Sequence, residues 1–393
     1  MTGNLAELFL LDPDVRFLNH GSFGACPEEV FARYQAWQRQ LERQPVAFLD
    51  PLRGYGEWMR DARVALAAEL GADPADLVGV MNATVGLNIV AQSLALQPGD
   101  EILTTDHEYA ALEKTWAYVA RRTGAVIKSI TVPLPLVDEA AFTAAVLAGM
   151  TDRTRVLFLS HITSATALVF PIENAIKEAR ARGIWSMIDG AHVPGHIALD
   201  LTALGADFYA GNCHKWLMAP KGSAFLHVRP EWQGMLNPLV ISHGWAVEPG
   251  PVGAFGNSTF IDSLEMQGTR DPAAWLTVPA AIKFRHDHGW DKVAASCTAL
   301  VQDTAQRIAR RTGLGAFAAP AFCAPQMVAL PIPPCEPLEL QKALLAEYRI
   351  EIPVFRWKDH HIVRVSAQGY NTPSEMDALV DGLTELLDLP QRP

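Results

Sequence analysis

Short apolar runs alternate with stretches of helical periodicity through the middle of the chain. The runs have the length and composition of buried strands and occupy residues 77–81, 101–105, 125–132, 155–162, 184–191, 207–213 and 223–228. Between them, apolar residues recur at helical spacing in residues 84–96, 109–124, 138–150 and 172–183. This alternation predicts an α/β fold, in which a mostly parallel sheet carries helices on both faces. Ligands of such sheets bind at the carboxyl ends of the strands.

The pattern changes beyond about residue 290. A long helical stretch (291–313) precedes proline-punctuated segments, a second helix (336–350), a strand-like run (360–368) and a closing helix (372–389). We therefore predict three parts. They are an N-terminal segment (1–20) associated with the small domain and the active site, a large domain (21–289), and a smaller α+β C-terminal domain (290–393).

Composition narrows the class of function. Hydrophobic residues make up 49% and charged residues 19% of the chain, as in an ordinary globular enzyme. The formal net charge of −11 argues against a nucleic-acid-binding surface, because phosphate contacts need clustered Lys and Arg. There is no apolar run of about 18 residues to predict a transmembrane helix, and the N-terminus lacks the positive region of a secretory signal.

Cysteine and histidine spacing argues against a metal site. The five cysteines show no CxxC pair, which favours reduced thiols in the cytoplasm over disulfides or a zinc site. The histidine-containing segments HDHG (286–289) and KDHH (358–361) also lack the spacing of zinc ligands. We therefore expect no bound metal.

Three candidate chemical groups follow predicted strands. Thr84 lies at a strand-to-helix turn that suits a phosphate, although Asn82 or Thr84 also fits a plain helix cap. Asp189 directly follows an apolar strand and is suited to a loop cap, a metal ligand or a fixed negative charge. Lys215 has apolar neighbours that disfavour its ammonium form, unless its side chain simply reaches solvent.

Together these groups match the requirements of pyridoxal phosphate. A helix terminus anchors the phosphate, an acid keeps the pyridine nitrogen protonated, and a lysine carries the aldehyde as an imine. The combination is more specific than any one member, because each group alone has an ordinary structural interpretation. No Walker or GxGxxG motif is present, so a nucleotide is not favoured.

Eight motifs spread over the chain strengthen this interpretation. They are FLNHGSFGACP, NATVGLN, TDHEYAALEKTW, SHITSATALVFPI, DGAHVPG, GNCHKWLMAPKGSAFL, GTRDPAAW and VRVSAQGYNT. With them, the sequence from about Leu18 to Leu387 resembles the class V aminotransferases, a group of fold-type I pyridoxal-phosphate enzymes. Within that group it is most similar to the isopenicillin N epimerase-like proteins. The resemblance implies pyridoxal 5′-phosphate as cofactor, a small-molecule amino-acid substrate and a homodimer with a shared active site.

The resemblance also implies a role for each matching residue. Lys215 would carry the cofactor and act as the base at the substrate Cα, Asp189 would pair with the pyridine nitrogen, and His192 would bond the phenolic oxygen. The residues expected to bind the substrate are Arg364, which would grip the carboxylate, with Asn19 and His20 of the N-terminal segment. Around the phosphate, the contacts would be Ala83 (through its backbone), Thr84, Asn212, His214 and Thr269 of the partner subunit. Ser164 would also contact the cofactor. Tyr109, or alternatively His107, would stack on the cofactor ring.

The expected reaction is epimerisation of an amino acid through an external aldimine and a quinonoid. The second acid would be Tyr109, His107 or His20. Three alternatives stay open: a C–S lyase, an aminotransferase, and a protein that has lost its catalytic activity and has a binding or regulatory role. The segment EIPVFRWKDHHIVRV contains no cysteine, whereas cysteine desulfurases carry their reactive cysteine there, so sulfur transfer through a persulfide is not expected.

Overall fold

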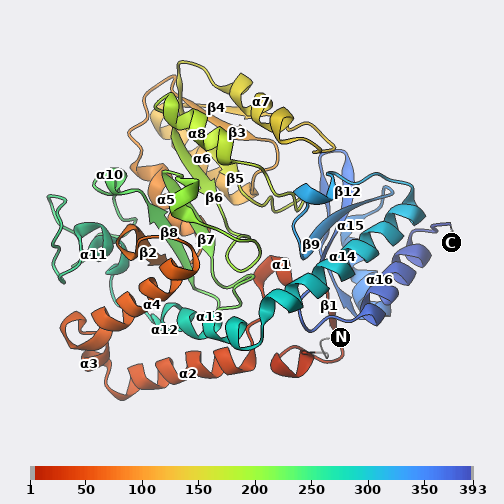
Figure 1. Cartoon of the computed structure of the whole chain (residues 1–393), viewed down its shortest axis with the longest axis horizontal. Helices are drawn as coiled ribbons and strands as arrows, with labels where there is room; N and C mark the ends of the chain where they lie inside the picture. Colours follow the sequence, from red (N-terminus) through yellow and green to blue (C-terminus); the bar gives the residue numbers. More distant parts are fainter. Residues whose placement is uncertain (1–4, 391–393) are drawn as a thin grey trace.

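The computed structural model describes residues 5–390, and its centre is a seven-stranded sheet in the order β2-β8-β7-β6-β5-β3-β4 (Figure 1). All neighbouring pairs are parallel except those of β8, which runs antiparallel to β2 and β7. Each predicted apolar run forms one strand, so the predicted α/β fold is confirmed. The strands are β2 (Leu77–Val80), β3 (Glu101–Thr105), β4 (Val126–Ile130), β5 (Thr154–Ser160), β6 (Trp185–Asp189), β7 (Phe208–Asn212) and β8 (Ala224–Val228).

Side chains of the central strands alternate between two apolar layers. On β5, Val156 and Phe158 pack into one layer, whereas Leu157 and Leu159 pack into the other. The first layer includes helices α5 (Ala83–Ser93) and α6 (Ala110–Thr123), and the second includes α7 (Glu139–Gly149) and α8 (Glu173–Ala181). The two-residue period of a strand produces this alternation. Because both faces are buried, the strands appear in the sequence as continuous apolar runs.

Further helices cover the β2 edge of the sheet, and they lie outside the region where alternating strands and helices were predicted. Helix α4 contacts β2 and packs against α13, and α12 packs against α2. Trp37 of α2 and Met59 of α4 are buried in the same apolar layer as α7 and α8. The remaining helices of this part are α1 (His20–Phe23), α2 (Glu28–Arg43), α3 (Pro45–Leu49), α4 (Gly56–Glu69), α9 (Leu201–Leu204), α10 (Pro230–Gln233), α11 (Thr259–Glu265), α12 (Ala273–Leu276) and α13 (Val278–Asp287).

The C-terminal part forms a second, smaller sheet in the antiparallel order β11-β12-β9. Its strands are β9 (Met327–Ile332), β11 (Val354–Trp357) and β12 (His360–Ser366). Helices α14 (Trp290–Thr312) and α15 (Pro337–Tyr348) pack on this sheet, and α16 (Pro373–Leu386) packs on both helices. Strand β1 (Arg16–Phe17) pairs in parallel with β10 (Ile350–Glu351), so the N-terminal segment lies against this part. The exact domain boundaries stay a prediction.

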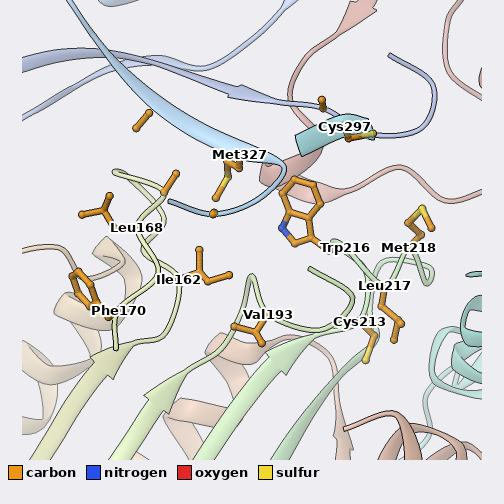
Figure 2. Close-up of a cluster of buried hydrophobic side chains, with 14 of the residues drawn as sticks. Ile162, Leu168, Phe170, Val193, Cys213, Trp216, Leu217, Met218, Cys297 and Met327 are labelled. Carbon is orange, nitrogen blue, oxygen red and sulfur yellow. The ribbon is translucent and has the colours of Figure 1, made fainter. Parts of the chain in front are cut away.

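An apolar cluster joins the two sheets directly behind the predicted cofactor lysine. Trp216 and Leu217 follow Lys215 in the chain and are fully buried. Figure 2 shows Trp216 between the strand ends of the large sheet and Met327 of β9. This packing holds the backbone on the C-terminal side of Lys215 in place. Within residues 5–390, no helix has the length and hydropathy needed to cross a membrane.

Candidate active site

A cavity of about 770 Å³ lies at the carboxyl ends of β5, β6 and β7. Its volume is typical of small-molecule sites, which span about 300–1,000 Å³. Arg364 of β12 contributes from the smaller sheet, so both parts of the chain line the cavity. The predicted site residues found in its lining are Ala83, Thr84, Tyr109, Ser164, Asp189, His192, Asn212, His214, Lys215 and Arg364.

Lys215 lies in the loop after β7, and its amine contacts His192. The Nζ atom is 2.9 Å from Nε2 of His192. Burial, aided by the positive charge of Arg364 and opposed by Asp189, lowers the pKa of Lys215 to about 7. Burial also holds the pKa of His192 well below its usual value, so the imidazole is neutral. A large share of Lys215 is therefore a free, nucleophilic amine near neutral pH.

This lowered pKa predicts how fast the apoprotein attaches pyridoxal phosphate. Only the free amine attacks the aldehyde, so the attachment rate should rise with pH through about 7 and level off above about pH 8. An ordinary lysine, with its pKa near 10.4, would give a rate that still rises above pH 9. Stopped-flow visible absorption between pH 5.5 and 9.5 distinguishes the two profiles. A continued tenfold rise per pH unit above pH 9 would contradict the lowered pKa.

Asp189, the last residue of β6, is a buried carboxylate that faces the cavity. Its side chain is 4% exposed, and its Oδ1 atom accepts the N–H of Ala191 at 2.9 Å. Burial raises the pKa of Asp189, while the Ala191 N–H and the charge of Lys215 oppose the rise. Among residues 5–390, no cationic side chain forms an ion pair with it. A buried carboxylate is costly without a positive partner, so this position fits a protonated pyridine nitrogen.

The N-terminus of α5 forms another wall of the cavity. Asn82 caps the helix by accepting the N–H of Val85 at 2.9 Å, so the plain capping role belongs to Asn82. The N–H of Ala83 donates to Oδ1 of Asn212 at 2.9 Å. In this structure Asn212 accepts that donor, and the phosphate contact through the Ala83 backbone stays a prediction. The helix terminus still favours an anion, and the Thr84 hydroxyl lies beside it in the cavity.

The charges around the cavity also suit an anionic cofactor. Arg364 and Lys221 are cationic side chains of its lining, beside the partly protonated Lys215, whereas Asp189 is the one acidic residue lining this cavity within the described chain. His214 contacts the carbonyl of Ser223 through Nδ1 at 3.1 Å, and this nitrogen donates because a carbonyl only accepts. Taken together, a buried acid, a reactive amine and a helix N-terminus in one cavity fit pyridoxal phosphate.

Arg364 reaches into the cavity with part of its guanidinium group engaged. One terminal nitrogen donates to the Ser164 carbonyl at 2.6 Å, and the other donates to Oγ of Ser22 at 2.9 Å. Its Nε–H is buried and has no partner among residues 5–390. Burial lowers the pKa of Arg364 to about 10, which leaves it charged at neutral pH. Ser22 was not predicted, and Asn19 reaches Arg364 only through it, by accepting the Ser22 hydroxyl at 2.5 Å.

Two histidines of the prediction do not line the cavity. His20 is fully buried, with Nδ1 2.9 Å from the Tyr370 hydroxyl and Nε2 3.0 Å from the carbonyl oxygen of Lys215. It therefore holds the backbone of the lysine loop, and direct substrate contact does not agree with its placement. His107 is also buried, with Nδ1 2.8 Å from the Thr166 hydroxyl. Its ring is therefore not available to stack on a cofactor in the cavity.

Tyr109 and Thr269 occupy different positions relative to the cavity. Tyr109, at the start of α6, lines it and is 45% exposed. Thr269 instead lines a separate cavity of about 280 Å³, together with Tyr55 and Arg270. Its predicted contact with the phosphate would therefore have to reach the cavity of a second subunit.

Comparison with known proteins agrees with this geometry. The family model for class V aminotransferases matches residues 26–379. The chain belongs to the class V aminotransferase family. This membership confirms the family resemblance and the expected dependence on pyridoxal phosphate. As a member of this family, the chain is an enzyme.

Relatives in this family catalyse different reactions. Isopenicillin N epimerase of Streptomyces clavuligerus is 39% identical over 387 residues, which cover 96% of each chain. A probable chloroplastic L-cysteine desulfhydrase of Arabidopsis thaliana is 30% identical and covers 96% of this chain and 84% of that protein. A structure of C-DES with glycine covalently linked to its pyridoxal-phosphate cofactor has a TM-score of 0.80 at 20% identity, over 95% of this chain and 97% of the other. That structure shows the shared fold.

Proposed function

We propose that this family member is a pyridoxal-phosphate-dependent epimerase that acts at the α carbon of an amino acid. When bound, pyridoxal phosphate supplies an electron-accepting ring joined to the substrate amine. The observation that carries the proposal is the placement of Lys215, Asp189 and Arg364 around one cavity. The 39% identity to an isopenicillin N epimerase supports epimerisation over other reactions at the same carbon.

Each of these side chains has a defined task in the proposed reaction. Arg364 binds the substrate carboxylate and so orients the Cα–H bond. The Lys215 amine takes the Cα proton, and His192 holds that amine through its 2.9 Å contact. Asp189 stays ionised beside the ring nitrogen and keeps it protonated. Thr84, Asn212 and His214 hold the phosphate at the N-terminus of α5.

Epimerisation also requires an acid that returns the proton to the opposite face of the α carbon. Of the three candidates Tyr109, His107 and His20, only Tyr109 lines the cavity. The other two have ring nitrogens bonded inside the protein. We therefore propose Tyr109 as the second acid, in addition to its predicted place against the cofactor ring.

Replacing Tyr109→Phe keeps the ring and removes the hydroxyl. Formation of the D-isomer should fall by about 10² to 10⁴, the usual contribution of a positioned acid or base. Exchange of the Cα proton of the L-isomer with heavy water should continue, because Lys215 is unchanged. Chiral chromatography with mass spectrometry measures both rates in one incubation. An equal loss of both rates would place Tyr109 outside the proton-return step.

Replacing Arg364→Lys keeps the positive charge and removes the forked pair of donors. KM for the amino acid should rise about 10- to 100-fold, because a charge-assisted hydrogen bond contributes about 1.5–3 kcal/mol. The change in kcat should be smaller, since the carboxylate contact is made in the ground state as well. Steady-state kinetics with the amino acid and its carboxamide provide the control, because the carboxamide should lose little. An unchanged KM would argue against carboxylate binding by Arg364.

The experiment that tests the function is incubation with a panel of L-amino acids in heavy water. Retained amino acid with deuterium at Cα and a D-isomer supports the epimerase. Release of pyruvate and ammonia would instead support a C–S lyase, the reading favoured by the 30% identity to a probable L-cysteine desulfhydrase. A pyridoxamine spectrum would support an aminotransferase. A purified protein that binds no pyridoxal phosphate would support a binding role alone.

We also propose a homodimer in the cytoplasm. Thr269 lies outside the main cavity. In the loop between α10 and α11, the apolar side chains of Ile241 and Trp245 are 59% and 40% exposed. A second subunit packed on this loop would bury them and bring Thr269 to the phosphate. All five cysteines are free thiols, which suits a reducing compartment. Sedimentation of the purified protein tests the oligomeric state.

A further inference from the structure

Glu108 is a buried acid beside the active-site cavity that the proposed reaction leaves without a task. Glu108 directly precedes Tyr109 in the sequence, and it is 8% exposed. The Thr105 hydroxyl lies 2.6 Å from one carboxyl oxygen and the Ser160 hydroxyl 2.6 Å from the other, and both hydroxyls donate when Glu108 is ionised. When Glu108 is protonated, its own O–H donates to one of them. Burial raises the pKa of Glu108 to about 8. The negative charge of Asp189 adds to this rise, whereas the hydrogen bonds from the two hydroxyls oppose it. Glu108 is therefore mostly a neutral acid at pH 7, with a proton it can give.

Ser160 connects this acid with the active site. It is the last residue of β5 and lines the active-site cavity. Its Cα is the direct partner of Asp189 across the parallel pair β5–β6. One hydroxyl group thus lies between the Glu108 carboxyl and the edge of the cavity where Asp189 is found.

A second cavity, of about 120 Å³, reaches Glu108 from the side of α6. Thr104 and Trp116 line it, and the Thr104 hydroxyl and the Trp116 N–H are buried with no hydrogen-bond partner among residues 5–390. Glu113 and Ser129 also line it and are exposed, so the cavity opens to solvent. The cavity has apolar walls as well, from Ile127 and Phe158, but its polar groups give water a place to bind beside Glu108. A bound water needs only about 10–15 Å³ and two or more polar partners.

We propose that Glu108 and Ser160 form a proton relay between this second cavity and the Asp189 end of the active site. In one concerted step the Ser160 O–H bond breaks as its proton passes to the cofactor ring nitrogen when that nitrogen is unprotonated, and the Glu108 O–H bond breaks as its proton restores the serine hydroxyl. Water in the second cavity then reprotonates the Glu108 carboxylate with a proton drawn from bulk solvent. No electrons are exchanged, and the reverse sequence returns a proton to solvent.

The relay rests on the proposed function, because the site it serves is the ring nitrogen of bound pyridoxal phosphate. Asp189 is buried and faces the main cavity, so a substrate bound there would separate it from water on that side. The relay gives this pair a route to solvent that stays open while the main cavity is filled. The charged groups that face the relay are Asp189 on the active-site side and Glu113 on the solvent side.

The test follows the ring N–H of the holoprotein. The protein is loaded with ¹⁵N-labelled pyridoxal phosphate, and NMR magnetisation transfer measures how fast the N–H proton exchanges with water. Glu108→Gln keeps a polar group between the two hydroxyls but has no acidic proton, so exchange should slow by about a hundredfold, the lower end of the effect of a positioned acid. Trp116→Phe, which removes a donor from the second cavity, should slow it as well.

Glu101→Gln is the matched control. Glu101 is another buried glutamate hydrogen-bonded to threonine hydroxyls, at the opposite end of β3 and outside both cavities. Its variant should leave the exchange rate unchanged. If Glu108→Gln fails to fold, Ser160→Ala interrupts the same route and should slow exchange equally. Unchanged exchange in folded variants with an intact N–H signal would overturn the relay. A wild-type protein that binds no pyridoxal phosphate would contradict the proposed function instead.

Discussion

Replacing Lys215→Ala is expected to abolish both turnover and the visible absorption of the lysine-bound cofactor. The Lys215 amine lies 2.9 Å from His192 in the cavity, and its lowered pKa makes it the reactive amine near neutral pH. A positioned base contributes about 10² to 10⁴ to a rate, and the variant also loses covalent attachment of the cofactor. Activity should therefore fall by at least about 10⁴. Absorption spectra of the reconstituted protein and a turnover assay measure the two effects separately.

The chain contains a matched control for this variant. Lys221 lines the same cavity, but its Nζ donates to the carbonyl of Gly24 at 2.9 Å and its side chain is more exposed. Lys221→Ala should keep the visible absorption, because Lys215 still carries the cofactor. If Lys215→Ala kept the absorption and Lys221→Ala lost it, the cofactor lysine would be Lys221.

Most of the large sheet could be predicted because its strands are buried on both faces. Such strands are continuous apolar runs in the sequence, and α5 to α8 between them have clear helical spacing. Helix α2 was not predicted, although Val30, Tyr34, Trp37 and Leu41 recur at helical spacing, and only Val30 and Trp37 of it are buried. Its place in the fold depends on contacts with α12 and α13, which are more than 200 residues away in the sequence.

The candidate site shows the same division between local and long-range information. Asp189 ends β6 and Lys215 follows the neighbouring strand β7. Parallel strands bring their carboxyl ends together, so the placement of both could be predicted. Ser22 could not be, because it meets Arg364 from 342 residues away. His20 shares the motif of Ser22, yet its ring turns into the core. Only the packing of the loops decides which of two neighbouring polar residues faces the cavity.

Replacing Asp189→Asn should lower turnover about a thousandfold while the protein still folds and attaches the cofactor. The amide has the same size, and its oxygen can accept the N–H of Ala191 as Oδ1 does now. It carries no negative charge, so the ring nitrogen loses the partner that keeps it protonated. Removing one partner of a buried charge pair costs about 3–5 kcal/mol, and about 4 kcal/mol corresponds to a factor of 10³ in rate. Steady-state kinetics and the absorption spectrum of the variant measure the effect.

The charge and not the hydrogen bond of Asp189 should cause this loss, and Asp189→Glu separates the two. The longer side chain keeps the carboxylate but displaces it from the Ala191 N–H, so it should recover part of the activity that Asn loses. The spectra provide a second check, because an unprotonated ring nitrogen in the Asn variant should lose its ¹⁵N–H signal while the lysine-bound absorption persists. If Asn were as active as the parent, the buried charge of Asp189 would have no part in the reaction. Because Asp189 forms no ion pair within residues 5–390, its burial would then require another positive partner in the cavity.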